Sequence, residues 1–363
     1  MLRSGLRDSK SRLKLGVFSL NCSGGINPSK LPRDYRMSWE HTSAIARRAE
    51  DIGFEFVLPV SKWRGFGGET DFYGESYETL TWAAGIAAQT STITVASTVL
   101  TSVIHPTFVA KATATIDAIA NGRSALNVVM GWYPPEIGQF GVEPAEHDTR
   151  YERGAEWLGA LRRLWTEDAP FSLDGQWTKI VGGLSKPKPI NQPLVMNAGT
   201  SPAGIQFAAR QCDLLLASRN TVEGTKAFVD NVKGTARERY GRELRVINVG
   251  QVICAPTEAE ALQRRNAIFE AADKVAVENF MKSAGLQSAS YDEKTLREHR
   301  ELFVTAAGGF PMVGTPDQVV AKMADMAEAG VDGFALGFFD YYDELGFFGE
   351  NVMPLLRKAG LHE

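Results

Sequence analysis

The segment Asn197-Ala198-Gly199-Thr200-Ser201-Pro202 combines several groups that could bind an anion in this chain of 363 residues. It stands between an apolar run that predicts a strand and a pattern that predicts a helix. Backbone N–H groups, hydroxyls and the positive end of a helix dipole would meet at Gly199, Thr200 and Ser201, an arrangement suited to a phosphate. An ordinary helix start, with Ser201 as N-cap, explains the same residues.

A second candidate is the loop Ser61-Lys62-Trp63-Arg64-Gly65-Phe66-Gly67-Gly68, which follows another predicted strand. It holds two cations, two aromatic rings and three glycines. Cations suit an anionic ligand, aromatic faces suit a flat ring, and glycines allow the backbone to approach closely. The loop does not match G-x-G-x-x-G, and a basic surface loop is the alternative interpretation.

A third candidate lies at the end of a predicted strand, where Asn127, Val129 and Trp132 offer an amide, an apolar wall and an indole face. These groups suit a neutral planar cofactor. A buried Asn needs partners, which the backbone or a heteroaromatic ring can supply. A core amide beside a core Trp is the alternative. The aromatic run from Phe338 to Tyr342 either walls a substrate cavity or belongs to a core or dimer surface.

The sequence weighs against metal and hydrolytic chemistry. Its five histidines show neither HxH nor HExxH spacing, so no metal site is predicted. Only His105 falls in a loop after a predicted strand, and there it is better explained by its place before the helix-starting Pro106 than as a catalytic base. No G-x-S-x-G elbow is present.

Composition limits the partners. The chain is 44% hydrophobic and 23% charged, as expected of a protein with a full core, and its net charge is −4. This charge leaves no electrostatic footprint for nucleic acid or anionic membranes, so small molecules are the expected partners. Three widely spaced cysteines indicate free thiols in a reducing compartment. Without a signal-peptide pattern or a membrane-spanning apolar run, the expected location is the cytoplasm.

Eight apolar runs predict strands, and patterns of helical period separate them. The predicted strands cover residues 13–20, 54–60, 93–98, 124–130, 194–197, 213–217, 246–254 and 333–338. The predicted helices begin at or just after Ser38, Glu78, Pro106, Arg150, Ser201, Val222, Thr257 and Thr315.

This alternation implies parallel pairing, so the predicted fold is an α/β (β/α)8 TIM barrel with insertions; an open doubly wound sheet is the alternative. We expect a flexible N-terminus over residues 1–12 and a single barrel domain over 13–363. Insertions are expected near 134–192, with a hairpin at Asp174-Gly175, and near 271–309, as a mobile lid. In such a barrel the loops after the strands form the active site.

One stretch resembles the bacterial luciferase-like flavin monooxygenases. It runs from Thr115 to Arg123 (TIDAIANGR) and continues as LNVVMGW from Leu126 to Trp132. A helix, an NGR turn, a strand and a terminal GW in this order are typical of that superfamily, and the resemblance extends from the first predicted strand to the last helix. Within it, the loop at 64–68 is similar to the pyrimidine oxygenases. The segments at 146–151 and 186–189 and the Phe-rich C-terminus resemble the dimethyl sulfone monooxygenases.

The resemblance implies a cofactor, FMN, and an oxygen site. Together with the phosphate loop, it implies FMN contacts at Ser61, Lys62, Asn127, Glu136, Arg150, Tyr151, Gly199, Thr200 and Ser201. At Ser61 the similar proteins carry an apolar residue, so a contact there would use the backbone. The implied O2 pocket consists of Leu58, Thr98, Asn127, Val129 and Trp132. Pockets of this kind give a flavin N5-peroxide rather than the C4a-hydroperoxide of most flavin monooxygenases.

The resemblance also implies a reaction. A separate NAD(P)H-dependent flavin reductase would deliver reduced FMN, since the chain carries no pyridine-nucleotide fingerprint. O2 would then oxygenate or cleave a small organic substrate such as a sulfone, an amide or a pyrimidine. A homodimer or homotetramer is implied as well. The alternatives are a deazaflavin-dependent hydride-transfer oxidoreductase and a non-catalytic flavin-binding homologue.

Overall fold

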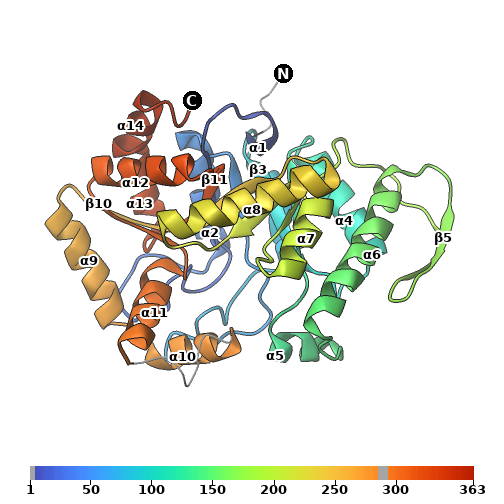
Figure 1. The fold of residues 1–363 in the computed structure, drawn as a ribbon, viewed down its shortest axis with the longest axis horizontal. Coiled ribbons are helices and arrows are strands. Elements are labelled where there is room, and N and C mark those ends of the chain that lie inside the picture. Colours follow the sequence, from blue (N-terminus) through green and yellow to red (C-terminus); the bar gives the residue numbers. More distant parts are fainter. Residues whose placement is uncertain (1–4, 285–292) are drawn as a thin grey trace.

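The computed structural model describes residues 5–284 and 293–363. Its centre is a closed ring of eight parallel strands, which confirms the predicted (β/α)8 barrel (Figure 1). In ring order these strands are β1 (Lys14–Phe18), β2 (Phe56–Leu58), β3 (Thr94–Leu100), β4 (Ser124–Val129), β7 (Leu194–Asn197), β8 (Leu214–Ala217), β9 (Arg245–Cys254) and β11 (Gly333–Gly337). Pairing of β9 with β8 closes the ring.

Helices surround this barrel, and their ends follow local sequence signals. Ser38, Ser201, Thr257 and Thr315 each accept a backbone hydrogen bond as N-caps, as predicted. Gly53 ends its helix in the left-handed region at φ 102°. The barrel helices are α2 (Trp39–Ile52), α3 (Thr79–Ala87), α4 (Pro106–Ile119), α6 (His147–Thr166), α7 (Pro202–Gln211), α8 (Val222–Tyr240), α12 (Pro316–Glu328), α13 (Tyr341–Asn351) and α14 (Met353–Lys358).

Strand residues divide between two apolar regions because successive side chains point to opposite faces. One set packs outward against the helices in the main core. The other fills the barrel interior and forms the floor of its C-terminal half. We call this interior cluster the floor; it includes Leu58, Ala96, Ala125, Met196 and Val249. Polar residues that follow the floor along the strands therefore point toward the mouth of the barrel.

The region near 134–192, where the first insertion was expected, contains a barrel helix and several shorter elements. Helix α6 is the barrel helix between β4 and β7, and it starts at His147, three residues before the predicted Arg150. The inserted parts are α5 (Pro134–Ile137), the 3-10 turn Gly138–Phe140 and a hairpin of β5 (Phe171–Asp174) and β6 (Lys179–Gly183). The antiparallel pairing of β5 and β6 confirms the hairpin at Asp174-Gly175.

The second insertion contains α9 (Glu258–Glu270), α10 (Lys274–Ser283) and α11 (Glu293–Ala306), which lie together on one side of the barrel (Figure 1). Residues 285–292 of the predicted lid lie outside the described residues. The insertion ends in a strand that the sequence pattern did not predict, β10 (Phe310–Gly314), which pairs with the second half of β9. Pro311 interrupts its strand pattern, and an edge position tolerates that proline.

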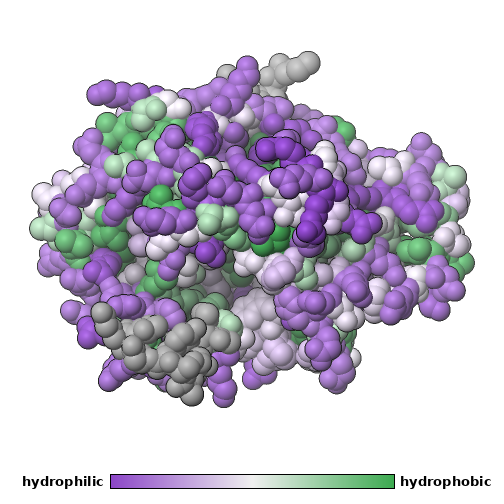
Figure 2. All heavy atoms as spheres, viewed as in Figure 1, coloured by the Kyte–Doolittle hydropathy of each residue, from purple (hydrophilic) through white to green (hydrophobic). Residues whose placement is uncertain are grey.

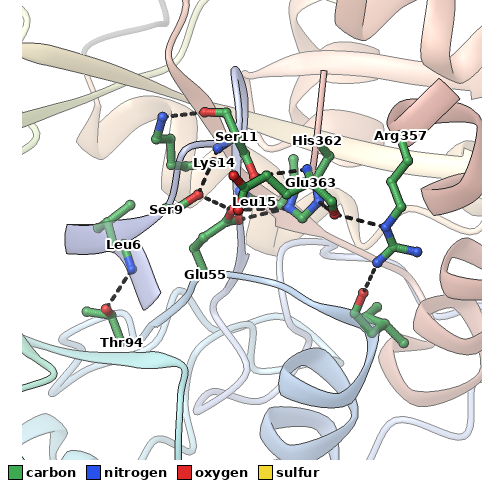
Figure 3. A network of polar contacts seen from close by, with 11 residues as sticks. Leu6, Ser9, Ser11, Lys14, Leu15, Glu55, Thr94, Arg357, His362 and Glu363 are labelled. Carbon is green, nitrogen blue, oxygen red and sulfur yellow. Dashed lines mark hydrogen bonds and ion pairs between the residues drawn. The ribbon is translucent and has the colours of Figure 1, made fainter. Parts of the chain in front are cut away.

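The N-terminal end of the barrel is closed by both ends of the chain (Figure 3). The Glu55 carboxylate accepts hydrogen bonds from Ser9 Oγ at 2.6 Å and from the Leu15 N–H at 2.7 Å, and it pairs with His362 Nε2 at 3.1 Å. The short helix α1 (Gly5–Asp8) buries Leu6 completely against the floor. Flexibility was expected over residues 1–12; within this polar segment, Leu6 is an apolar anchor.

On the face shown in Figure 2, the surface over α8 is mostly hydrophilic. Within the described residues, every helix is too short or too polar to cross a membrane. Cys22, Cys212 and Cys254 are free thiols.

Candidate active site

A cavity of about 730 Å³ opens at the C-terminal ends of β4 and β7. Its walls come from the turn after β4, the start of α6, the turn before α7 and helix α10. The lining residues are Val129, Met130, Gly131, Trp132, His147, Arg150, Tyr151, Asn197, Ala198, Gly199, Thr200, Ser201, Phe280, Ser283 and Ala284. The turn before α7 thus faces the same space as the arginine and tyrosine of α6.

The turn before α7 is shaped by a glycine. A Cβ added to Gly199 would lie 2.2 Å from Tyr151 Oη, so only glycine lets α6 and α7 approach here. The Gly199 N–H is held by Asn197 Oδ1 at 2.8 Å, and Ser201 Oγ accepts the Gly204 N–H at 3.2 Å. The N-terminus of α7 therefore opens onto the cavity next to Tyr151, where its dipole favours an anion.

Arg150 supplies the positive charge at this rim. Its Nη1 donates to the Gly131 carbonyl at 2.6 Å, which holds the guanidinium beside the turn after β4. Its buried Nε has no partner among the described residues. A guanidinium fixed by one nitrogen keeps further donors for an anion, and its planar fork fits a phosphate or a carboxylate.

Deeper in the barrel, Asn127 and Thr98 form a buried polar pair directly above the floor. Asn127 Nδ2 lies 3.3 Å from Thr98 Oγ1, which itself donates to the Pro59 carbonyl at 2.7 Å. Asn127 Oδ1 is buried and has no hydrogen-bond partner in the described part of the chain. Since buried amide oxygens are normally paired, this atom is suited to meet a group that the protein itself does not supply.

Lys62 and Glu136 form a buried ion pair beside the cavity. Their charged atoms lie 3.5 Å apart, and the Trp63 N–H donates to Glu136 Oε1 at 2.6 Å. Burial lowers the pKa of Lys62 and raises the pKa of Glu136, while the charge of each partner opposes the shift. The ion pair connects the loop after β2 to the segment after β4. In this structure Lys62 and Glu136 therefore bind each other.

Aromatic rings surround this ion pair and reach the cavity. Lys62 Nζ lies 4.8 Å from the ring centroid of Trp132 and 5.1 Å from that of Phe66, within cation–π range. Phe66 packs on Phe280 of α10, with centroids 4.9 Å apart. Trp132 remains 42% exposed at the cavity wall. Helix α10, the loop after β2 and the turn after β4 thus share one aromatic cluster of Phe66, Trp132 and Phe280, which we call the roof.

The structure brings most of the predicted site residues together, but not all of them. Arg150, Tyr151 and residues 199–201 line the cavity with Val129 and Trp132, while Leu58, Thr98 and Asn127 lie in the buried interior next to it. Ser61 is absent from the lining. The run 338–342 is also absent from it, since Phe338 and Tyr341 belong to the main core. His105 is the N-cap of α4, as expected of a loop histidine.

Beyond the segments 129–132 and 197–201 and the pair Arg150 and Tyr151, the lining includes four residues that were not predicted: His147, Phe280, Ser283 and Ala284. His147 begins α6 and pairs with Asp148 at 2.7 Å, and the other three come from α10 and the residue after it. His147 was missed because helix α6 was expected to start later, at Arg150. Phe280 could have been suspected only from the polar, helical character of the proposed lid. Within the described residues, no group of three or more His, Cys, Asp or Glu side chains is placed to hold a metal ion.

The residues present fit FMN. The rim at Arg150 and Ser201 fits the phosphate, and the orphaned Asn127 Oδ1 and the indole of Trp132 fit a polar, planar ring. The rim at Arg150 and Ser201 lies at the opening of the barrel, and the Asn127 amide lies deeper inside it. This arrangement suits a long ligand with an anionic end. Fold and site together define a (β/α)8 enzyme with a place for a phosphorylated planar cofactor.

The comparisons with known proteins identify the family. Residues 13–333 match the family model of the luciferase-like monooxygenases, and the chain belongs to this family. It is 32% identical over 358 residues to an FMNH2-dependent dimethylsulfone monooxygenase of Pseudomonas fluorescens, with 96% of both chains covered. It is 33% identical over 355 residues to the pyrimidine monooxygenase RutA of Acinetobacter baylyi, with 95% of both covered. The predicted family and enzyme class are confirmed.

Solved structures agree with the fold. The crystal structure of the long-chain alkane monooxygenase LadA superposes with a TM-score of 0.87 at 22% identity, covering 98% of this chain and 93% of that one. At this identity the likeness supports the barrel and its insertions, and the chemistry has to be argued from the site.

Proposed function

We propose that this chain is an FMNH2-dependent two-component monooxygenase that oxygenates or cleaves a small organic substrate. The observation that carries the proposal is the joint presence of an anion-binding rim and an unpaired buried amide oxygen at one barrel mouth. The two curated relatives, which match over nearly their whole length, are an FMNH2-dependent sulfone monooxygenase and a pyrimidine monooxygenase. Reduced FMN supplies the electrons that activate O2.

In this proposal each group of residues has one task. Arg150, Tyr151 and the turn 199–201 bind the phosphate. Thr98 and Asn127 orient O2, and Leu58, Val129 and Trp132 enclose it in an apolar space. The roof excludes water, which protects the oxygen chemistry from side reactions. Lys62 and Glu136 hold the wall in place through their ion pair. The particular flavin atom that O2 meets, N5 in our hypothesis, depends on how Asn127 faces the ring.

The partners of the proposed enzyme follow from its chemistry. A separate NAD(P)H-dependent flavin reductase delivers reduced FMN. The other two reactants are O2 and a small organic substrate. The proposed location is the cytoplasm, which supplies NAD(P)H and keeps cysteines reduced. We expect a homodimer or homotetramer. The substrate is of sulfone, amide or pyrimidine type, since these classes suit an apolar cavity with few polar groups.

Titration with flavin tests the proposal. The protein is titrated anaerobically with FMN before and after dithionite reduction, and the monooxygenase function predicts tighter binding of the reduced form. Equal or absent binding of FMN would contradict it. Preferential binding of a reduced deazaflavin, with no reaction toward O2, would support the hydride-transfer alternative. Binding of reduced FMN without product from any sulfone, amide or pyrimidine would support the non-catalytic homologue.

A further inference from the structure

The side-chain amide of Gln251 on β9 is buried and makes no hydrogen bond to the described residues. Its side chain is 0% exposed, and neither Nε2 nor Oε1 has a hydrogen-bond partner in the described ranges 5–284 and 293–363. Burial of an amide without partners is unfavourable, because both atoms lose their hydrogen bonds to water. Nearby on the same strand, Asn248 shows the usual arrangement: its Oδ1 accepts the Arg219 N–H at 3.0 Å and its Nδ2 donates to the Arg219 carbonyl at 2.9 Å.

Strand alternation places Gln251 in the mouth of the barrel. Val249, two residues before it, belongs to the floor, and Ile253, two residues after it, packs in the apolar cluster that includes Phe66 of the roof. Residues two apart on a strand share a face. The amide therefore lies between floor and roof, on the interior face of β9.

This position is across the barrel from the proposed O2 site. In the ring, β9 is four strands from β3 in either direction, so Gln251 lies on the wall opposite Thr98. The anion rim belongs to β4, α6 and α7. A ligand between these walls would be bounded by the O2 site on one side and by Gln251 on the other.

We propose that Gln251 recognises the substrate, and that the substrate presents a hydrogen-bond acceptor next to a donor in one plane, as a lactam, imide or ureide does. A carboxamide offers an acceptor and a donor side by side, and such a group satisfies both at once. A sulfone offers acceptors alone and would leave Oε1 unpaired. The proposal rests on the proposed monooxygenase function, whose substrate class it narrows.

The pyrimidine edge of the flavin itself carries the same acceptor–donor chemistry. We assign Gln251 to the substrate because the groups that we assign to the cofactor are on the opposite side, at Asn127 and along the rim of β4 and α7. These two possibilities differ in a measurable way. If Gln251 binds the flavin, its replacement will weaken the binding of reduced FMN; if Gln251 binds the substrate, its replacement will leave that affinity unchanged.

The test compares the wild type, Gln251→Leu and the matched control Asn248→Leu. Each protein is loaded anaerobically with reduced FMN, whose affinity is measured, and is then titrated with uracil, 2-piperidone and dimethyl sulfone by calorimetry. We expect the wild type to bind uracil and 2-piperidone at least about 10-fold more tightly than dimethyl sulfone. Gln251→Leu should lose about 10- to 100-fold of the affinity for these two amides, the effect of one or two hydrogen bonds, and keep its affinity for reduced FMN.

Thermal unfolding of the flavin-free proteins separates recognition from a structural role. Gln251→Leu should melt at the same or a higher temperature, because it removes an unpaired amide, while Asn248→Leu should melt lower. Unchanged uracil affinity, weaker binding of reduced FMN or a lower melting temperature in Gln251→Leu would each overturn the proposal. Failure of the wild type to bind reduced FMN would instead refute the monooxygenase function on which it rests.

Discussion

Thr98 Oγ1 lies 2.7 Å from the Pro59 carbonyl and 3.3 Å from Asn127 Nδ2. The hydroxyl proton goes to Pro59, so the oxygen can only accept from Asn127. This orients the Asn127 amide, with Nδ2 toward Thr98 and Oδ1 left without a partner among the described residues. The pair thus presents a fixed acceptor to the barrel mouth.

Removal of this amide should slow the reaction with oxygen. Asn127→Ala should reduce the rate at which bound reduced FMN is reoxidised by O2 by about 10- to 100-fold, as expected when one oriented buried hydrogen-bonding group is lost. Thr98→Val should have a smaller effect in the same direction, since the amide stays but is no longer oriented. Stopped-flow absorbance measures both rates. An unchanged rate in Asn127→Ala would exclude the proposed role.

The Lys62–Glu136 pair predicts a non-additive effect on stability. Lys62→Met leaves the Glu136 carboxylate buried without its partner, which should cost about 3–5 kcal/mol of unfolding free energy, and Lys62→Met/Glu136→Gln should recover most of this loss. Urea unfolding at pH 7.5 measures the three proteins. Because burial already raises the pKa of Glu136, the single variant should lose less at pH 5, where the carboxyl can be protonated. Equal stability of the single and double variants would contradict this.

A change in the anion-binding rim should weaken binding only of ligands that carry a phosphate. Arg150→Lys keeps the charge but loses the planar fork, so the dissociation constant of reduced FMN should rise about 10-fold. Riboflavin lacks the phosphate and should bind both proteins equally. The matched control is Arg153→Lys on the same helix, since Arg153 donates to the Ser102 carbonyl at 2.8 Å and is not part of the cavity wall. An equal loss of affinity for FMN and riboflavin would show that Arg150 does not bind the phosphate.

The sequence alone predicted the barrel because each of its strands is an apolar run followed by a helix start. It did not predict β10, where Pro311 follows two glycines and where pairing with the distant β9 decides the structure. In the site, Arg150 and Ser201 were found from their chemistry and from the resemblance. Gln251 was not, because a lack of partners is a property of the folded chain and leaves no pattern in the sequence.

The contact between Glu55 and His362 predicts a pH dependence at the other end of the barrel. Burial alone would lower the pKa of His362, but the hydrogen bond and charge of Glu55 outweigh it and raise this pKa above its usual value. The folded state therefore binds the proton more tightly. Its stabilisation is full below the pKa of an unfolded histidine and is lost as the pH rises through the folded pKa.

We expect the wild type to lose about 1 kcal/mol of unfolding free energy from this site between pH 5.5 and pH 8, the net contribution of a typical hydrogen bond. His362→Gln should lack this part of the dependence. Urea unfolding across the range compares the two proteins, and parallel pH profiles would refute the role of His362.

Asp273 connects helix α10 to the loop after β2. As N-cap of α10 it accepts the Ala276 N–H at 3.3 Å, and it also accepts the N–H and hydroxyl of Thr70 at 2.7 and 2.8 Å. Asp273→Ala should cost about 1–2 kcal/mol, as the loss of a cap does, and speed hydrogen exchange in α10. The control is Asp230→Ala, which removes an exposed pair with Lys226 and should cost less than about 0.5 kcal/mol. Unchanged exchange in α10 would mean that Asp273 does not hold this helix in place.

The pairing of β10 with β9 has a further consequence. The second insertion leaves the barrel after Cys254 and returns along the same strand, with Gly314 in register with Cys254. The segment that contains α9, α10 and α11 thus leaves and rejoins the barrel at one strand, while the phosphate rim is built on β4, α6 and α7. Chimeras that exchange residues 255–309 between members of the family should therefore keep flavin affinity and change the range of substrates.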